Sequence, residues 1–245
     1  MGILTRQRLP SERQPGASNS IASAAAVAPD NQRASKGLKE FLWHLSDVER
    51  GCILDLGPIS QATVDFFTGK KFKLYSNDLL REWTRFLAAE KRDRRLATAA
   101  AGAATAGAPA GGALPKPDDE GDRAALALKF VSTRIDYPRE TFHGVLAWDL
   151  LDYFPPELAA PFVTWLHQIV RPGGVVLVVL HSRAPVIQHR YRVRDAETLE
   201  FLPAQETVKF FRVLPNREVL NLFGQFRSSK TFVGRDQIRE AMFTR

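Results

Sequence analysis

The stretch LHQIVRPGGVVLVVL, residues 166–180, decides the fold. Its last six residues, Val175 to Leu180, are the longest uninterrupted apolar run in the chain. Such a run is typical of a central parallel strand that is buried on both faces. The apolar residues before it recur at helical spacing, and Pro172-Gly173-Gly174 predicts the end of that helix. A helix that leads straight into a buried strand indicates an α/β fold.

The same alternation of strand and helix extends in both directions from this stretch. We expect further strands at 52–56, 72–75, 126–131 and 144–148, and helices at 37–45, 60–69, 79–96 and from Pro156 onward. After residue 180 we expect a hairpin of 191–193 with 198–201, a helix at 216–223 and strands at 226–233 and 238–243. The last of these segments also fits a helix.

Two segments of low complexity bear on the domain organisation. Residues 1–35 are rich in Pro, Ser, Gly and Ala without a sustained period, which predicts a disordered tail. Residues 97–122 are rich in Ala, Gly and Pro, and their Gly and Pro content argues against a long stable helix. This second segment is either a linker between two domains or an insertion. Because its flanks continue one pattern, we favour a single domain, 36–245, with an insertion at 97–122.

The composition excludes several classes of protein. Cys52 is the only cysteine among the 245 residues, so an intrachain disulfide framework or a cysteine-based zinc cluster is impossible. The five histidines show no metal-ligand spacing, and we predict no metal site. No apolar run approaches the roughly 20 residues that span a membrane. The expected location is the cytoplasm. The net charge of +7 favours anionic partners in general.

Candidate binding residues follow the first two expected strands. Asp55 and Gly57 end the first strand, and Ser60 precedes the helix that follows. A glycine at such a turn lets the backbone approach a ligand closely. Asp78 ends the second strand, 21 residues after Gly57, where a carboxylate can accept both hydroxyls of a ribose. Asp78 also fits the N-cap of the next helix.

At this point the sequence resembles the class I S-adenosylmethionine (SAM)-dependent methyltransferases. The resemblance spans roughly residues 37–245. It is carried by five stretches: CILDLG, LYSNDL, FHGVLAWDLLDYFPPE, LHQIVRPGGVVLVV, and NREVLNLFGQF with the two strands that follow it. It implies a Rossmann-like, mostly parallel sheet of seven strands with helices on both faces, in which the C-terminal hairpin contributes an antiparallel strand.

The resemblance also implies roles for single residues. Asp55 and Gly57 would position the methionine part of SAM, Asp78 would hold the ribose hydroxyls, and Asp149 would line the pocket that faces the methyl group. The sequence departs from the family in the first motif, where Ile59 and Gln61 replace two glycines. Ile59 resists a positive φ, and Pro58 removes one N–H donor. Either SAM binds with altered geometry or the site has lost it.

Four residues are candidates for catalysis. Asp149 and Asp152 are suitable for acid/base chemistry, although one fits a cap and the other a solvated position. Tyr153 and His181 lie near the ends of the fourth and fifth strands and fit either a substrate contact or a structural role. We therefore expect transfer of a methyl group to an acceptor that is a small molecule or of unidentified class. The positive net charge of the chain is compatible with an anionic acceptor. The alternative is an inactive, methyltransferase-like binding or scaffold protein.

Two basic clusters and the tryptophans complete the sequence analysis. Arg81, Arg85, Lys91, Arg92, Arg94 and Arg95 form one basic cluster, and Arg183, Arg190, Arg192 and Arg194 form the other. Both fit a solvated basic face, and nucleic-acid binding is the weaker alternative because no recognised motif accompanies them. Trp43, Trp83, Trp148 and Trp165 lie within apolar patterns and are expected to pack.

Overall fold

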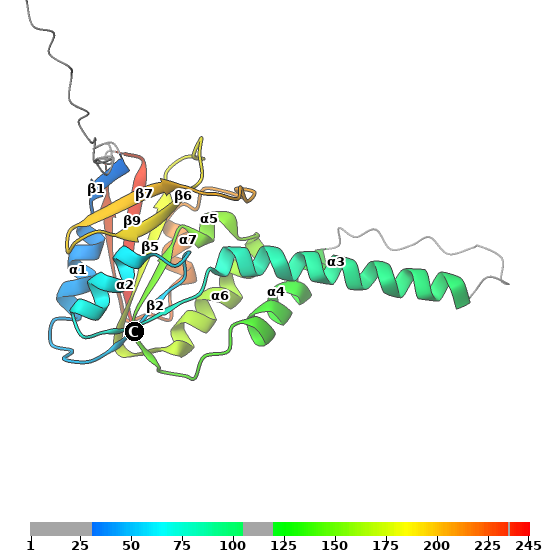
Figure 1. Ribbon diagram of the computed structural model, residues 1–245, viewed down its shortest axis with the longest axis horizontal. Helices are drawn as coiled ribbons and strands as arrows, with labels where there is room; N and C mark the ends of the chain where they lie inside the picture. Colours follow the sequence, from blue (N-terminus) through cyan, green and yellow to red (C-terminus); the bar gives the residue numbers. More distant parts are fainter. Residues whose placement is uncertain (1–30, 105–119, 235) are drawn as a thin grey trace, which may run out of the picture.

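The computed structural model describes residues 31–104, 120–234 and 236–245. Its central sheet has six strands in the order β3-β2-β4-β5-β9-β8 (Figure 1). These strands are β2 (Cys52–Asp55), β3 (Lys73–Ser76), β4 (Phe142–Trp148), β5 (Val170–His181), β8 (Ser228–Val233) and β9 (Ile238–Thr244). The strands β3, β2, β4 and β5 are parallel to one another, whereas β9 runs antiparallel to both of its neighbours.

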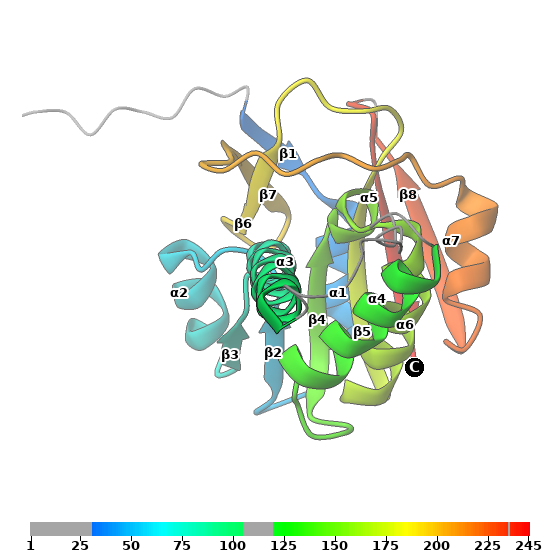
Figure 2. The same ribbon diagram turned by 90° about the vertical axis from the view of Figure 1, so that its right-hand side faces the viewer.

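Helices cover both faces of this sheet (Figure 2). Helices α1 (Lys36–His44) and α2 (Gln61–Gly69) lie on one face, and α3 (Leu79–Ala104), α4 (Glu120–Arg134), α5 (Leu150–Tyr153), α6 (Pro156–Ile169) and α7 (Asn216–Leu222) on the other. Along β5, Val176, Val178 and Leu180 belong to one hydrophobic cluster, and Val175, Leu177 and Val179 to the other. This alternation explains why residues 175–180 are all apolar, because both faces of this part of β5 are buried.

The predicted third strand is wrong. Residues 126–131 belong to α4, and the described part of the chain contributes six strands, not seven, to the central sheet. The buried residues Ala127 and Phe130 are three positions apart and Leu128 is exposed, which is helical spacing. Short apolar runs do not distinguish a strand from a buried helix, and here tertiary packing decided. The Phe130 ring lies 5.0 Å from Trp83 and 5.4 Å from Phe86, both on α3.

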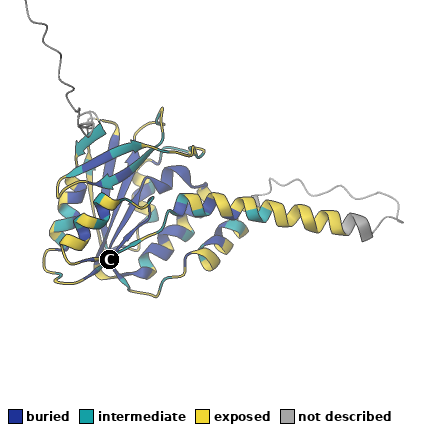
Figure 3. Ribbon diagram, viewed as in Figure 1, coloured by how far each residue is buried: buried dark blue, intermediate teal, exposed yellow. Residues whose placement is uncertain are grey.

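Helix α3 is longer than predicted and extends away from the sheet, with its outer part exposed (Figure 3). It continues to Ala104, so the first eight residues of the predicted insertion are helical. Alanine has the highest helix propensity, and in this stretch only Gly102 opposes it, because the prolines of the insertion come later. Residues 120–122 of the predicted insertion belong to α4, and residues 105–119 lie outside the described residues.

A second, three-stranded sheet crosses above the first, in the order β1-β7-β6. It contains β1 (Gln32–Ala34), β6 (His189–Val193) and β7 (Thr198–Pro203). The predicted hairpin is therefore present, and the segment from 238 is a strand. Residues 1–30 of the predicted tail lie outside the described residues. Its last residues are structured, because β1 pairs with β7 and Ser35 caps α1. Among the described residues, the structure contains no helix of the length and hydrophobicity that crossing a membrane requires.

Candidate functional site

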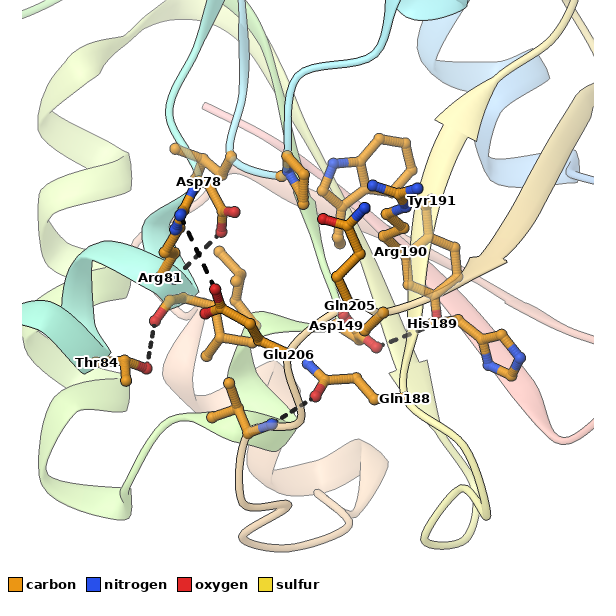
Figure 4. A pocket seen from close by; sticks show the side chains of 18 residues that line it. Asp78, Arg81, Thr84, Asp149, Gln188, His189, Arg190, Tyr191, Gln205 and Glu206 are labelled. Atoms are coloured by element: carbon orange, nitrogen blue, oxygen red, sulfur yellow. Dashed lines mark hydrogen bonds and ion pairs between the residues drawn. The ribbon is translucent and has the colours of Figure 1, made fainter.

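A pocket lies at the carboxyl ends of β2, β3 and β4 (Figure 4). It has an empty volume of about 880 Å³, part of which is open to solvent. The chain leaves β2 on one side to form β3 and on the other to form β4, so the pocket lies where the strand order reverses. In open α/β sheets, ligands bind in this crevice. The pocket is therefore the candidate functional site.

Gly57 lies on the wall of the pocket, at a position where a larger residue would not fit. A Cβ at this position would lie 2.7 Å from Trp148 Nε1. The same indole nitrogen donates a hydrogen bond of 2.6 Å to Asp55 Oδ1, and the Gly57 N–H donates to the same oxygen at 3.0 Å. Asp55 is buried and does not line the pocket. It holds Trp148 and Gly57 in place, whereas these two residues face the pocket.

Trp148 has a backbone conformation that bulky residues avoid, with φ at 42°. Such a conformation costs on the order of 1–3 kcal/mol and persists only where the surroundings impose it. Here the bond to Asp55 and a stack on Tyr191, with ring centroids 5.5 Å apart, hold the indole. The prediction that Trp148 packs is confirmed, but the sequence analysis did not place it at the site. Trp43, by contrast, is 66% exposed, so the same prediction is wrong for it.

The two unusual residues of the glycine turn, Pro58 and Ile59, both line a second cavity, but only Pro58 lines the main pocket. Ile59 is 75% exposed and does not line the main pocket, so it does not block it. Pro58 lines both this pocket and a second cavity of about 470 Å³. Ser60 is at the N-cap of α2, but its side chain makes no capping hydrogen bond. It lines the second cavity, which Arg190 and Tyr191 share with the main pocket.

Asp78 lies on the wall of the pocket next to the first turn of α3. Its Oδ1 accepts a hydrogen bond of 3.2 Å from the Arg81 N–H, so the expected N-cap is present. Burial raises the pKa of Asp78, and the contacts with Arg81 partly oppose this effect. Arg81 also lies 3.9 Å from Glu206 across the pocket. The structure therefore brings Gly57, Asp78 and Asp149 to one pocket.

Asp149 reaches the pocket from the end of β4 and connects it to a buried cluster. Tyr191 donates its hydroxyl hydrogen bond to Asp149 Oδ2 at 3.2 Å, and His181 Nε2 lies 3.9 Å from the same oxygen. On its other side His181 Nδ1 is 3.0 Å from Asp152 Oδ2, which also accepts the His181 backbone N–H at 2.7 Å. Of these four residues, Asp149 and Tyr191 line the pocket.

The buried cluster corrects the sequence-based alternatives for the two aspartates. Asp152 has no exposed surface, so it is not solvated, and Asp149 makes no side-chain cap bond. Tyr153 is buried as well, next to His181, and lines no part of the pocket. The four catalytic candidates therefore lie together, although 28 residues separate Tyr153 from His181 along the chain.

Burial dominates the electrostatics of these carboxyl groups. It raises the pKa of Asp149 to about 7, although the nearby His181 charge opposes the shift. Burial raises the pKa of Asp55 to about 6, against the hydrogen bonds from Trp148 and Gly57. Burial by itself would lower the pKa of His181, but the bond to Asp152 and the charge of Asp149 outweigh it, so this pKa is raised.

The hairpin β6–β7 and the segment after it form the rest of the pocket wall. Gln188, His189, Arg190 and Tyr191 line it from β6 and the residue before it, and 204–206 and Val208 line it from the segment after β7. Gln188 Oε1 accepts a hydrogen bond of 2.8 Å from the Val208 N–H, which joins the two parts. The sequence predicts the hairpin but not its position. Local periodicity carries no signal for where a hairpin packs.

Several residues of the basic clusters are ion-paired. Arg85 lies 3.0 Å from Glu82, Arg94 lies 3.0 Å from Asp122, and Arg192 lies 2.5 Å from the buried Glu200. Within the described ranges, no group of three or more His, Cys, Asp or Glu side chains has the geometry to hold a metal ion.

Comparison with known proteins gives a similarity of structure only. No protein-family model and no curated protein matches this sequence. The structure is similar to a 1,6-didemethyltoxoflavin-N1-methyltransferase from Burkholderia thailandensis with bound S-adenosylhomocysteine (12% identity, 85% of this chain and 76% of that chain, TM-score 0.43). It is also similar to the glycopeptide N-methyltransferase MtfA complexed with SAM (14% identity, 84% and 91%, TM-score 0.40). These TM-scores are below 0.5, and the proposals below rest on this chain's own topology and pocket.

Proposed function

We propose that this chain is a SAM-dependent methyltransferase that acts on a small-molecule acceptor. The observation that carries the proposal is that Gly57 and Asp78 both line one pocket, at the point where the strand order reverses. A carboxylate at the end of the second parallel strand is the group that accepts ribose hydroxyls in nucleotide sites of this topology. The last strand of the chain, β9, runs antiparallel to β5, as the resemblance of the sequence to the class I methyltransferases implies.

The residues at the pocket fit a nucleoside. Asp78 uses Oδ1 for the helix cap, and a carboxylate oxygen has more than one lone pair for further hydrogen bonds. Leu56 and Leu80 add apolar surface to the wall of the pocket. Ile59 does not line this pocket, although it lines the second cavity.

We assign the roles as follows. Asp78 binds the ribose, and the backbone of Gly57 lies along the sulfonium end, where Trp148 excludes water. Asp55 does not touch the ligand and positions Trp148 and Gly57. Ser60 contacts the amino-acid end through the second cavity. Bound SAM supplies an electrophilic methyl group, and positioning it in line with the acceptor contributes a large part of the rate of such a transfer.

Calorimetry with SAM and S-adenosylhomocysteine tests the proposal. We expect the folded protein to bind both, and Asp78→Asn to weaken binding about 10–100-fold, because a charged acceptor contributes roughly 1.5–3 kcal/mol. Asparagine can still cap α3, so this variant should keep its fold. Asp65→Asn is the matched control, because Asp65 is an exposed acid of α2.

The outcomes separate the methyltransferase from the alternative of an inactive, methyltransferase-like binding protein. One feature favours that alternative, namely that Pro58 lacks an N–H donor at the glycine turn. Failure of the folded protein to bind either ligand at millimolar concentration would support the alternative. Binding that Asp78→Asn leaves unchanged would contradict the role of Asp78.

A further inference from the structure

Asp149, His181 and Asp152 form a continuous array of acid, imidazole and acid. The array extends from the pocket wall into the core, with His181 Nε2 at 3.9 Å from Asp149 Oδ2 and Nδ1 at 3.0 Å from Asp152 Oδ2. All three side chains are at least 93% buried. Only Asp149 faces the pocket. A proton that arrives from the pocket therefore meets Asp149 first.

The surroundings supply few compensating charges. Tyr191 on β6 donates its hydroxyl hydrogen bond to Asp149, and Tyr153 on α5 packs edge-on against the His181 ring. Arg239 on β9 donates from Nη2 to the His181 carbonyl at 3.2 Å and favours the charged form of Asp152. Burial, and to a smaller extent the His181 charge, lower the pKa of His189 on β6.

The array is suited to accept one proton at neutral pH. Two carboxylates around one imidazolium leave a single net negative charge, and adding one proton neutralises it. An isolated aspartate, with a pKa near 3.9, is a weak base at pH 7. A general base acts best when its pKa lies near the working pH. The burial that raises the pKa of Asp149 to about 7 brings it into this range.

We propose that Asp149 is the general base of the methyl transfer and that the acceptor is a small molecule whose nucleophile is an O–H or N–H group. His181 and Asp152 are positioning residues that act through Asp149. The inference rests on the proposed function. In the step, the acceptor oxygen or nitrogen bonds to the methyl carbon, the carbon–sulfur bond breaks with its electron pair going to sulfur, and the acceptor proton moves to the Asp149 carboxylate.

The first test measures titration in the free protein. With ¹⁵N-labelled histidine, nuclear magnetic resonance follows His181 from pH 5 to 9, its signal being identified by its absence in His181→Gln. We expect His181 to stay protonated above the ordinary histidine pKa of about 6.5. Asp149→Asn and Asp152→Asn should both lower its pKa, because both carboxyl groups stabilise the imidazolium. His44→Gln on α1 is the matched control and should leave the His181 titration unchanged.

The second test measures transfer of the labelled methyl group of SAM to a panel of phenols, catechols, primary amines and azoles, with dimethyl sulfide as an acceptor that carries no proton. We expect transfer to at least one protic compound and none to dimethyl sulfide. Asp149→Asn should reduce transfer by about 10²–10⁴-fold, the usual contribution of a general base. His181→Gln should move the acid limb of the pH profile to higher pH, because the His181 charge holds the pKa of Asp149 down.

The outcomes distinguish the two proposals. If the protein binds SAM but methylates none of the protic compounds, or if Asp149→Asn transfers at the rate of the unmodified protein, the base assignment is wrong and the cofactor proposal stands. A pH profile that His181→Gln does not move contradicts the role of His181. If SAM does not bind while the coupled titration is present, the methyltransferase proposal fails, and the array is a buried acid–imidazole cluster without a transfer reaction.

Discussion

The two carboxylates at opposite walls of the pocket illustrate how environment separates binding from proton transfer. Asp78 lies at the start of α3, half-buried, and accepts a backbone N–H, which favours its charged form. Asp149 lies at the end of β4, buried against an imidazole and a second acid. Both follow a parallel strand, so sequence position alone does not distinguish them. Burial raises the pKa of both carboxyl groups, but the contacts with Arg81 oppose the shift at Asp78, whereas complete burial raises the pKa of Asp149 to about 7.

Asp149→Asn tests the buried side of this comparison and has the largest expected effect. The folded pKa of Asp149 lies near 7 and the unfolded value near 3.9, so the folded state binds more protons between these values. Its contribution to the free energy of unfolding therefore falls as pH rises from about 4 to 7, by up to about 4 kcal/mol. The Asp149→Asn variant has no titrating carboxyl group at this position and therefore lacks this pH-dependent contribution. Urea unfolding at pH 4.5, 6 and 8 measures it.

The variant should thus gain stability relative to the unmodified protein as the pH rises. Asp78→Asn serves as the comparison, because a half-buried carboxylate gives a much smaller pH dependence. Parallel curves for the unmodified protein and Asp149→Asn would show that Asp149 titrates as an ordinary aspartate, and the distinction between the two walls would disappear.

Trp148→Phe tests how the glycine turn is held. Phenylalanine preserves a ring to stack on Tyr191 but removes the indole N–H that Asp55 accepts. We expect a loss of about 1–3 kcal/mol in the free energy of unfolding, which is the cost of leaving a buried acceptor without its donor. The loss should be larger at pH 8 than at pH 5, because the indole bond favours the charged carboxylate.

Trp165→Phe provides the matched control for this substitution. Trp165 Nε1 donates to the neutral carbonyl of Ile135 at 3.0 Å, so its loss should cost the same at both pH values. A pH-independent cost for Trp148→Phe as well would mean that Asp55 does not change its charge between pH 5 and pH 8, contrary to a pKa of about 6.

Asp78→Ala tests whether the Asp78 carboxylate caps α3. Alanine removes the N-cap of α3, which costs about 1 kcal/mol in unfolding free energy, whereas asparagine retains the cap. Thermal unfolding of both variants measures the difference. If alanine and asparagine are equally stable, the Asp78 carboxylate does not cap the helix.

Ile59→Ala has the smallest expected effect. Its side chain is 75% exposed, so we expect a change within about 0.5 kcal/mol in unfolding free energy. Ile53→Ala on β2 is the buried counterpart and should cost roughly 2–5 kcal/mol. A loss above 1 kcal/mol for Ile59→Ala would show that the side chain packs against the turn, as the sequence-based reading of a blocked site requires.

The sequence allowed most elements to be predicted, because each depends on local periodicity. The expected strands at 52–56, 72–75 and 144–148, the hairpin and the helix from Pro156 are present with small shifts of boundary. The exception at 126–131 has a physical reason. A run of apolar residues fits a buried helix as well as a strand, and the rings of Trp83 and Phe86 on α3 supply a surface for a helix.

The site could be predicted only in part. Gly57, Asp78 and Asp149 follow strands that share one edge of the sheet, and this geometry alone brings them to a common pocket. Asp55 also lies at the end of a parallel strand, but it does not line the pocket, because its carboxyl group is hydrogen-bonded to the Trp148 indole. The covering residues, among them Arg190 and Glu206, belong to a hairpin and a segment whose docking depends on long-range contacts.

By itself, the sequence determined the α/β alternation and the acids at the strand ends, because hydrophobic period and strand direction are local properties. Tertiary structure decided which acid is buried, since Asp149 meets His181 and Tyr191 only when β4, β5 and β6 assemble. It also decided that Ile59 lies outside the main pocket and lines the second cavity. These outcomes depend on desolvation and packing between segments far apart in the chain, and no local pattern encodes them.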